Sequence, residues 1–265
     1  MGHETVIALS PEEAAQILEA SPDAVLIGGG ALAFWRAGMT TGLPSALSAG
    51  VTTDVDFLGG KEAALELARN LKQDFGLRVE VYIPKFGDIT PETAKVNIFG
   101  YGDRSPDEYV VVDYLGVIYG FADEDEERML RRAPEVEAAT FKFRVMHPID
   151  VLISRIRNLS GLPAKQNDIG EAQARLAVDV MRFWFENDAG LGDASLERHG
   201  PDGAYSALAA AEDVIDLAIH RSGRNVFSRH GIDVLNAIPV ESFATNAFVT
   251  ERWPRALAYL EKIRG

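Results

Sequence analysis

The chain has 265 residues and a formal net charge of −14, with 47% hydrophobic and 25% charged residues, so it can form one large or two modest domains. The acidic balance argues against general attraction to nucleic acid or anionic lipid, although basic residues outnumber acidic ones between Arg128 and Arg175. The absence of cysteine excludes disulfides and thiolate metal sites. No secretion signal or bilayer-length apolar run occurs, which predicts a soluble cytoplasmic protein without a membrane partner.

The N-terminal half shows the alternation of helices and strands that is typical of an α/β region. Ser10, Pro11 and Glu13 form a helix start with a capping box. Then DAVLIGG predicts a buried strand, ALAFWRAG a short helix that ends at Gly38, and TTDVDFLG a second strand. An amphipathic helix that ends at Gly76 follows. Three further β-rich runs come next: LRVEVYI, KVNIF and YVVVDYLGVIYG.

The pattern becomes helical after about residue 145. Pro148 and Pro254 suit helix starts, and four segments have helical spacing: HPIDVLISRIRNL, EAQARLAVDVMRFWFEN, AYSALAAAEDVIDLAIHR and RWPRALAYLEKI. We therefore predict two domains. Residues 1–145 would form an α/β domain, and residues 146–265 a helical bundle domain.

A glycine triplet between the first strand and its helix permits a dinucleotide interpretation. Gly28-x-Gly30-x-x-Ala33 matches a relaxed phosphate-binding fingerprint, and the acidic Asp54 lies downstream. However, an NAD-dependent Rossmann enzyme needs a long series of parallel strands with crossover helices. This chain turns helical after five strand-like runs, so the dinucleotide interpretation is the weaker one.

Two aspartates in the second strand favour a metal site. In an extended strand Asp54 and Asp56 point to the same face, about 6.5–7 Å apart, and two adjacent anions are costly unless a cation lies between them. Mg²⁺, or Mn²⁺ in its place, takes carboxylate and phosphate oxygens as ligands. A third carboxylate on a neighbouring strand would allow two ions. Asp113 in VVVDYL is the candidate and Glu80 in RVEVYI the alternative, because alternation alone does not separate them.

The glycines and threonines around this strand suit a nucleotide triphosphate. Gly29 and Gly30 would let the backbone approach the phosphates closely, and the following helix start would add amide donors. Thr52 and Thr53 would supply hydroxyls to phosphate or order the turn. A lone glycine triplet is usually a tight turn, and a lone Asp-Val-Asp is often an exposed strand end. The ordered combination favours nucleotide binding.

This combination resembles the nucleotidyltransferase superfamily that includes DNA polymerase β, the tRNA CCA-adding enzymes and the aminoglycoside nucleotidyltransferases. The shared signature is a strand-end glycine turn, a short helix, an Asp-x-Asp strand and a later aspartate: here Gly29-Gly30, Asp54-x-Asp56 and Asp113. The resemblance implies an α+β fold, with a nucleotidyltransferase-type mixed sheet flanked by helices in the N-terminal domain. It also implies Mg²⁺ held by the three aspartates, and transfer of a nucleoside monophosphate from an NTP to an acceptor hydroxyl. The GGG-A turn lacks the serine that is usual in this superfamily.

The helical half resembles AbiEii-type toxin nucleotidyltransferases over about residues 147–180. There Lys165 and Asp168 form a Lys-x-x-Asp pair after an SRIRNL helix. The resemblance implies that Lys165 contacts phosphate and that Asp168 orients it or binds the acceptor; a solvated ion pair is the alternative. It also implies an acceptor such as tRNA or another macromolecule, and an antitoxin partner. A small-molecule acceptor, as in the aminoglycoside enzymes, and a non-catalytic nucleotide-binding or interaction module remain alternatives.

Overall fold

The computed structural model describes residues 9–41, 55–85, 87–88, 90–138, 140–187, 207–243 and 247–264. The chain divides into two compact units, residues 1–147 and 148–265. That these units are independently folding domains stays a prediction. The fold class is α+β as predicted: the first unit contains a mixed sheet flanked by helices, and the described part of the second unit is helical.

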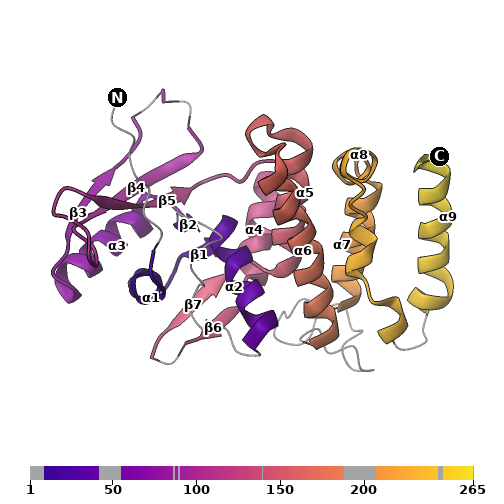
Figure 1. Ribbon diagram of the computed structural model, residues 1–265, viewed down its shortest axis with the longest axis horizontal. Coiled ribbons are helices and arrows are strands. Elements are labelled where there is room, and N and C mark those ends of the chain that lie inside the picture. Colours follow the sequence, from indigo (N-terminus) through magenta and orange to yellow (C-terminus); the bar gives the residue numbers. More distant parts are fainter. Residues whose placement is uncertain are drawn as a thin grey trace. The chain divides into compact units, whose positions relative to one another are not determined.

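The first unit is built on a seven-stranded sheet with the order β3-β4-β5-β2-β1-β7-β6 (Figure 1). β1 pairs antiparallel with β2 and parallel with β7, whereas β2 pairs parallel with β5. The remaining pairs are antiparallel. The strands are β1 (Val25–Ile27), β2 (Val55–Leu58), β3 (Arg78–Tyr82), β4 (Glu92–Phe99), β5 (Tyr109–Leu115), β6 (Glu135–Glu137) and β7 (Lys142–Val145). The helices are α1 (Pro11–Glu19), α2 (Gly28–Thr41), α3 (Lys61–Asp74) and α4 (Asp123–Arg132).

The two faces of β3, β4 and β5 differ in burial. Along β4 and β5 every second side chain is buried, and these buried side chains share one face of the sheet. α3 packs against β3 and β4 (Figure 1) and buries Leu67 and Leu71 completely. The intervening side chains are half-buried in β4, half-buried or exposed in β5, and largely exposed in β3. The sheet therefore has a covered face and an open face in this region.

The helix α2 is longer than the sequence predicts. It begins directly after β1 at Gly28 and continues through Gly38 to Thr41. Glycine costs a helix about 1 kcal/mol relative to alanine, but tertiary packing outweighs that cost here. The Phe34 ring meets the Phe143 ring of β7 edge-to-face at 5.3 Å, and Trp35 Nε1 donates a hydrogen bond to the Met146 carbonyl oxygen at 2.9 Å. Trp35 is thus a packing residue, as expected.

The second unit consists of helices in its described part. α5 packs against α6 and α8, and α7 packs against α8. The buried Trp184 and Phe185 rings lie 5.3 Å apart, which agrees with their predicted place in the core. The elements are α5 (Pro148–Gly161), η1 (Pro163–Lys165), α6 (Asp168–Asn187), α7 (Ala207–Ile219), α8 (Arg221–His230), η3 (Val234–Ala237), η4 (Val240–Ser242), the π-helical η5 (Phe248–Arg252) and α9 (Trp253–Arg264).

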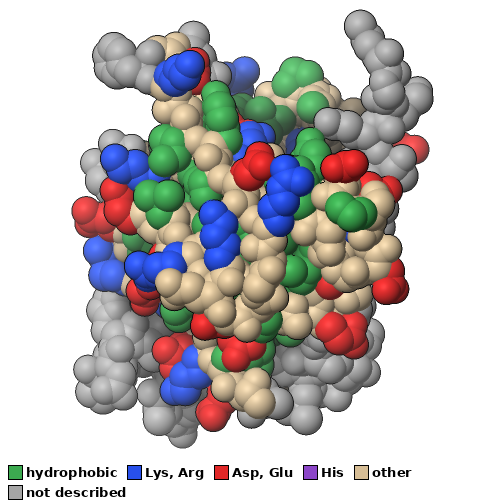
Figure 2. Space-filling view, turned by 90° about the vertical axis from the view of Figure 1, so that its left-hand side faces the viewer, with side chains coloured by type: hydrophobic (Ala, Val, Ile, Leu, Met, Phe, Trp, Pro, Cys, Tyr) green, Lys and Arg blue, Asp and Glu red, His purple; other side chains and the backbone are tan. Residues whose placement is uncertain are grey.

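The surface carries charges of both signs. Figure 2 shows basic and acidic side chains intermixed with hydrophobic ones over one side of the molecule. Among the helices of the described ranges, none is both long enough and apolar enough to cross a bilayer.

Candidate functional site

The structure brings together two of the predicted aspartates. Asp56 of β2 and Asp113 of β5 are Cα partners in the parallel ladder between these strands. Directly opposed residues on neighbouring strands project from the same face, with the strands roughly 4.8 Å apart. Both aspartates are half-buried, and Asp113 alternates with buried Val112 and Tyr114 of the covered face. Asp56 and Asp113 therefore share the open face of the sheet.

Asp56 and Asp113 form a row across neighbouring strands, which we call the carboxylate row. A lysine that the sequence analysis did not single out extends this row. Lys95 of β4 is the Cα partner of Asp113, and its Nζ lies 3.4 Å from Asp113 Oδ1 and 3.2 Å from Glu92 Oε1. Burial disfavours the charged lysine, but the hydrogen bonds and charges of Glu92 and Asp113 outweigh burial and raise the pKa of Lys95. The row across β4, β5 and β2 thus reads cation, anion, anion. Its only sequence signal was the place of Lys95 among the apolar residues of KVNIF.

A glycine at the start of α2 comes directly against Asp56. Gly28 has φ of +66°, and a Cβ added there would lie 2.3 Å from Asp56 Oδ2. The left-handed backbone therefore favours glycine at this position, and a Cβ there would force the Asp56 side chain to shift. This close approach places the beginning of α2 beside Asp56 and Asp113. The first amides of a helix lack partners within that helix. The sequence analysis did not foresee this contact between Gly28 and Asp56.

The other two glycines of the triplet lie inside the first turn of α2. Gly29 and Gly30 are both buried. A Cβ at Gly30 would lie 2.9 Å from Leu26 Cδ1, so the packing of α2 onto β1 explains glycine at this position without any ligand. The contact of either residue with a triphosphate stays a prediction.

Glu80, the alternative third carboxylate, lies further away on β3. Its Cα partner is Asn97 of β4, so a whole strand separates it from β5, which corresponds to roughly 10 Å. The exposed Glu80 carboxylate forms an ion pair with Arg78 at 2.9 Å. Of the two acids, Asp113 is the one in register with Asp56.

Three predicted residues, Thr52, Thr53 and Asp54, lie outside the described residues. Within the described ranges no cluster of three or more His, Asp or Glu side chains is arranged to hold a metal ion; Asp54, one of the three predicted ligands, lies outside those ranges. The donor set nevertheless fits Mg²⁺. This ion favours carboxylate oxygens, and it is usually bound by one or two carboxylates together with substrate phosphates and water.

Lys165 and Asp168 belong to the second unit, where both side chains are exposed. Lys165 ends η1 and Asp168 begins α6. A Cβ at Gly170 would lie 1.8 Å from the Lys165 carbonyl oxygen, and Asn167 Oδ1 accepts a hydrogen bond from the Gly170 amide at 2.9 Å. These contacts fix a tight turn before α6. The predicted functions of Lys165 and Asp168 stay predictions.

The antiparallel pairing of β1 with β2 speaks against the dinucleotide alternative. A Rossmann fold places its first βαβ unit in a parallel sheet, with a crossover helix between neighbouring parallel strands. Here α2 connects two antiparallel neighbours instead. The glycine triplet therefore lacks the strand arrangement in which that fingerprint binds a dinucleotide.

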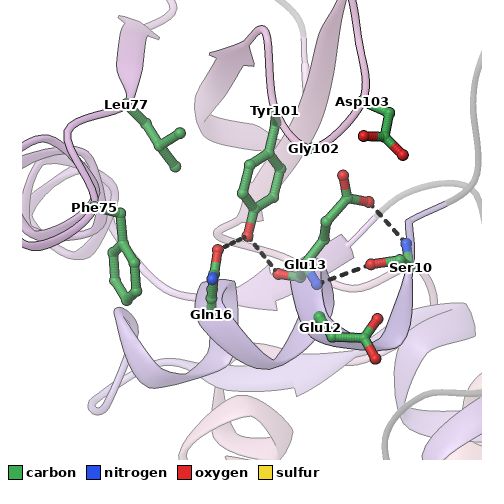
Figure 3. A pocket seen from close by; sticks show the side chains of 9 residues that line it. All are labelled: Ser10, Glu12, Glu13, Gln16, Phe75, Leu77, Tyr101, Gly102 and Asp103. Atoms are coloured by element: carbon green, nitrogen blue, oxygen red, sulfur yellow. Dashed lines mark hydrogen bonds between the residues drawn. The ribbon is translucent and has the colours of Figure 1, made fainter.

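A separate pocket of about 420 Å³ lies between α1 and the turn that joins β4 to β5 (Figure 3). Phe75 and Leu77 line it on one side, and the Tyr101 hydroxyl donates a hydrogen bond to the Glu13 carbonyl oxygen at 2.8 Å. Arg104 forms an ion pair with the Glu13 carboxylate. Burial, followed by the charge of Glu13, raises the pKa of Tyr101. These contacts anchor α1 to the turn between β4 and β5.

Comparisons with known proteins give only distant structural similarity. No protein-family model matches the sequence, and no curated protein matches it significantly. Among solved structures, the chain is similar to MenT4, a nucleotidyltransferase toxin from Mycobacterium tuberculosis, with 13% sequence identity, a TM-score of 0.33, and coverage of 92% of this chain and 90% of that chain. A match at this TM-score supports no conclusion about fold or activity.

Proposed function

We propose that this protein is a Mg²⁺-dependent nucleotidyltransferase, which moves a nucleoside monophosphate from an NTP to an acceptor hydroxyl. The observation that carries the proposal is the register of Asp56 with Asp113 on the open face of the sheet, beside the start of α2. Two like charges directly opposite each other on neighbouring strands destabilise a sheet. A divalent cation between them would convert this repulsion into binding energy.

The chain's own groups would bind and orient the substrate. Asp56 and Asp113, with Asp54 as predicted from the sequence, would hold Mg²⁺, or Mn²⁺ in its place. The ion would neutralise phosphate charge and make the acceptor hydroxyl more acidic. Asp113 would accept the acceptor proton. The first amides of α2, at Gly29 and Gly30, would donate to phosphate oxygens. Positioning and electrostatics of this kind account for most of the catalysis in phosphoryl transfer.

The remaining groups belong to the proposal on sequence grounds. Thr52 and Thr53 would donate hydroxyls to phosphate, Lys165 would contact the leaving pyrophosphate, and Asp168 would orient that lysine. The resemblance to AbiEii-type toxins supports tRNA or another macromolecule as the acceptor and an antitoxin as a partner. An aminoglycoside-like small molecule is the alternative acceptor, favoured by the net charge of −14.

The test is transfer of label from each α-³²P-labelled NTP, with Mg²⁺, to tRNA or to aminoglycosides. We expect transfer by the wild type that is lost in Asp56→Asn and in Asp54→Asn. Glu80→Gln is the control, because it removes a carboxylate from the same face without changing the Asp56–Asp113 pair. NTP binding without transfer would instead indicate the non-catalytic module. NAD binding that does not depend on metal would return the dinucleotide alternative.

A further inference from the structure

We propose that Lys95 is a placeholder cation, which holds the Asp113 carboxylate beside Asp56 in the metal-free protein and gives it up when the divalent cation binds. This inference rests on the proposed function, because it takes Asp56 and Asp113 as metal ligands. It assigns a positioning function to a residue that does not itself bind the ion.

In the metal-free site two carboxylates lie close together. Asp56 and Asp113 oppose each other directly, so without a cation their repulsion would push the side chains apart and leave the site poorly formed. Lys95 supplies a positive charge from the other side of Asp113, with its Nζ 3.4 Å from Oδ1. The three residues occupy one row across three neighbouring strands.

Lys95 has a second anionic partner besides Asp113. Lys95 Nζ also lies 3.2 Å from Glu92 Oε1, so the ammonium keeps an anionic partner after it releases Asp113. The two anionic partners are almost equally exposed, with side-chain values of 19% for Glu92 and 20% for Asp113. Glu92 lies on the same strand as Lys95 and is not one of the proposed metal ligands, so it is the partner that Lys95 would keep when Asp113 binds the ion.

The two substitutions that follow have opposite expected effects on metal affinity. Lys95→Met removes a positive charge near the ion and should tighten Mn²⁺ binding by about fivefold to twentyfold, allowing for partial exposure. Glu92→Gln leaves Asp113 as the only anionic partner that we assign to Lys95, so Lys95 would compete more strongly with the ion for Asp113. This substitution should weaken Mn²⁺ binding by about twofold to fivefold. Both effects should be larger at low ionic strength.

The assay is titration with Mn²⁺ alone, followed by the electron paramagnetic resonance signal of the free ion. Lys142→Met is the matched control, because Lys142 forms a cross-strand ion pair with Glu135 at 2.9 Å and the substitution changes net charge equally. Lys95→Arg retains the charge and should bind Mn²⁺ like the wild type. Thermal unfolding in EDTA gives a second measurement, in which Lys95→Met should lose stability and recover it on addition of Mn²⁺.

The outcomes separate this inference from the proposed function. If the wild type binds Mn²⁺ in a manner that depends on Asp56 and Asp113, but Lys95→Met binds it equally or more weakly, only the placeholder proposal is overturned. A merely structural lysine would give that result together with lower stability. If the wild type does not bind Mn²⁺, or if Asp113→Asn has no effect, both proposals are wrong.

Discussion

Replacement of Gly28 by alanine tests the contact between α2 and the carboxylate row. A left-handed backbone costs an L-residue about 1–2 kcal/mol, of which about 0.4–1 kcal/mol is offset by the lower entropy of the unfolded chain. The new Cβ would also lie 2.3 Å from Asp56 Oδ2, so the carboxylate must move by about 1 Å to reach van der Waals distance. Such overpacking costs about 1–3 kcal/mol. We expect a total loss of about 2–4 kcal/mol for Gly28→Ala.

Gly76→Ala is a closely matched control in the same unit. Gly76 has the same φ of +66°, but a Cβ there would meet nothing within 4 Å, so only the backbone cost remains, about 1 kcal/mol after the entropic offset. Urea unfolding in EDTA, followed by circular dichroism, measures both variants. Only Gly28→Ala should also weaken Mn²⁺ binding, because it displaces Asp56. Equal losses of stability, with wild-type Mn²⁺ affinity in both variants, would refute this reasoning.

Three further predictions concern the stability of the first unit. Tyr101→Phe removes the hydroxyl that donates to the Glu13 carbonyl oxygen and should cost about 1–2 kcal/mol in urea unfolding; an unchanged transition midpoint would contradict the anchoring function. Leu67→Ala truncates a fully buried side chain of α3 and should cost about 2–5 kcal/mol, seen as a lower thermal midpoint. Burial, and then the charge of Arg132, lowers the pKa of His147 to about 3. The unfolded chain therefore binds the extra proton as the pH falls below about 6.5, and between pH 7 and pH 5 the wild type should lose about 2 kcal/mol relative to His147→Gln. Parallel pH profiles of the two proteins would show that His147 is not buried in its neutral form.

Much of the first unit could be predicted from local patterns. The capping box at Ser10 and Glu13 is formed as expected. Each predicted run contains a strand in its described part, but the strand in YVVVDYLGVIYG ends at Leu115. β6 and β7 were missed because EVE and KFRV are too short and too charged to give a strand signal. Their strand conformation comes from tertiary pairing, in which β7 lies parallel to β1 and carries β6 at the edge.

The candidate site was predictable only in part. The residue types of Asp56 and Asp113 and their strands could be read from the sequence, but their register could not, because pairing between distant strands is set by the whole sheet. For the same reason, the alternation of apolar and polar residues along the strands did not show whether Asp113 or Glu80 is the third carboxylate. The order of β3, β4 and β5 distinguishes them. Lys95 and Gly28 depend on contacts between different elements, for which a single sequence gives no local signal.

Measuring Mn²⁺ binding to aspartate variants tests whether Asp56 and Asp113 bind a divalent cation. Asp56→Asn and Asp113→Asn each remove one proposed ligand and should weaken binding roughly tenfold or more. Glu80→Gln removes an exposed acid of β3 that is ion-paired with Arg78 and should bind Mn²⁺ like the wild type. We therefore expect weaker Mn²⁺ binding in the two aspartate variants and unchanged binding in Glu80→Gln. Equal affinity in the wild type and Asp113→Asn, or a loss confined to Glu80→Gln, would contradict it.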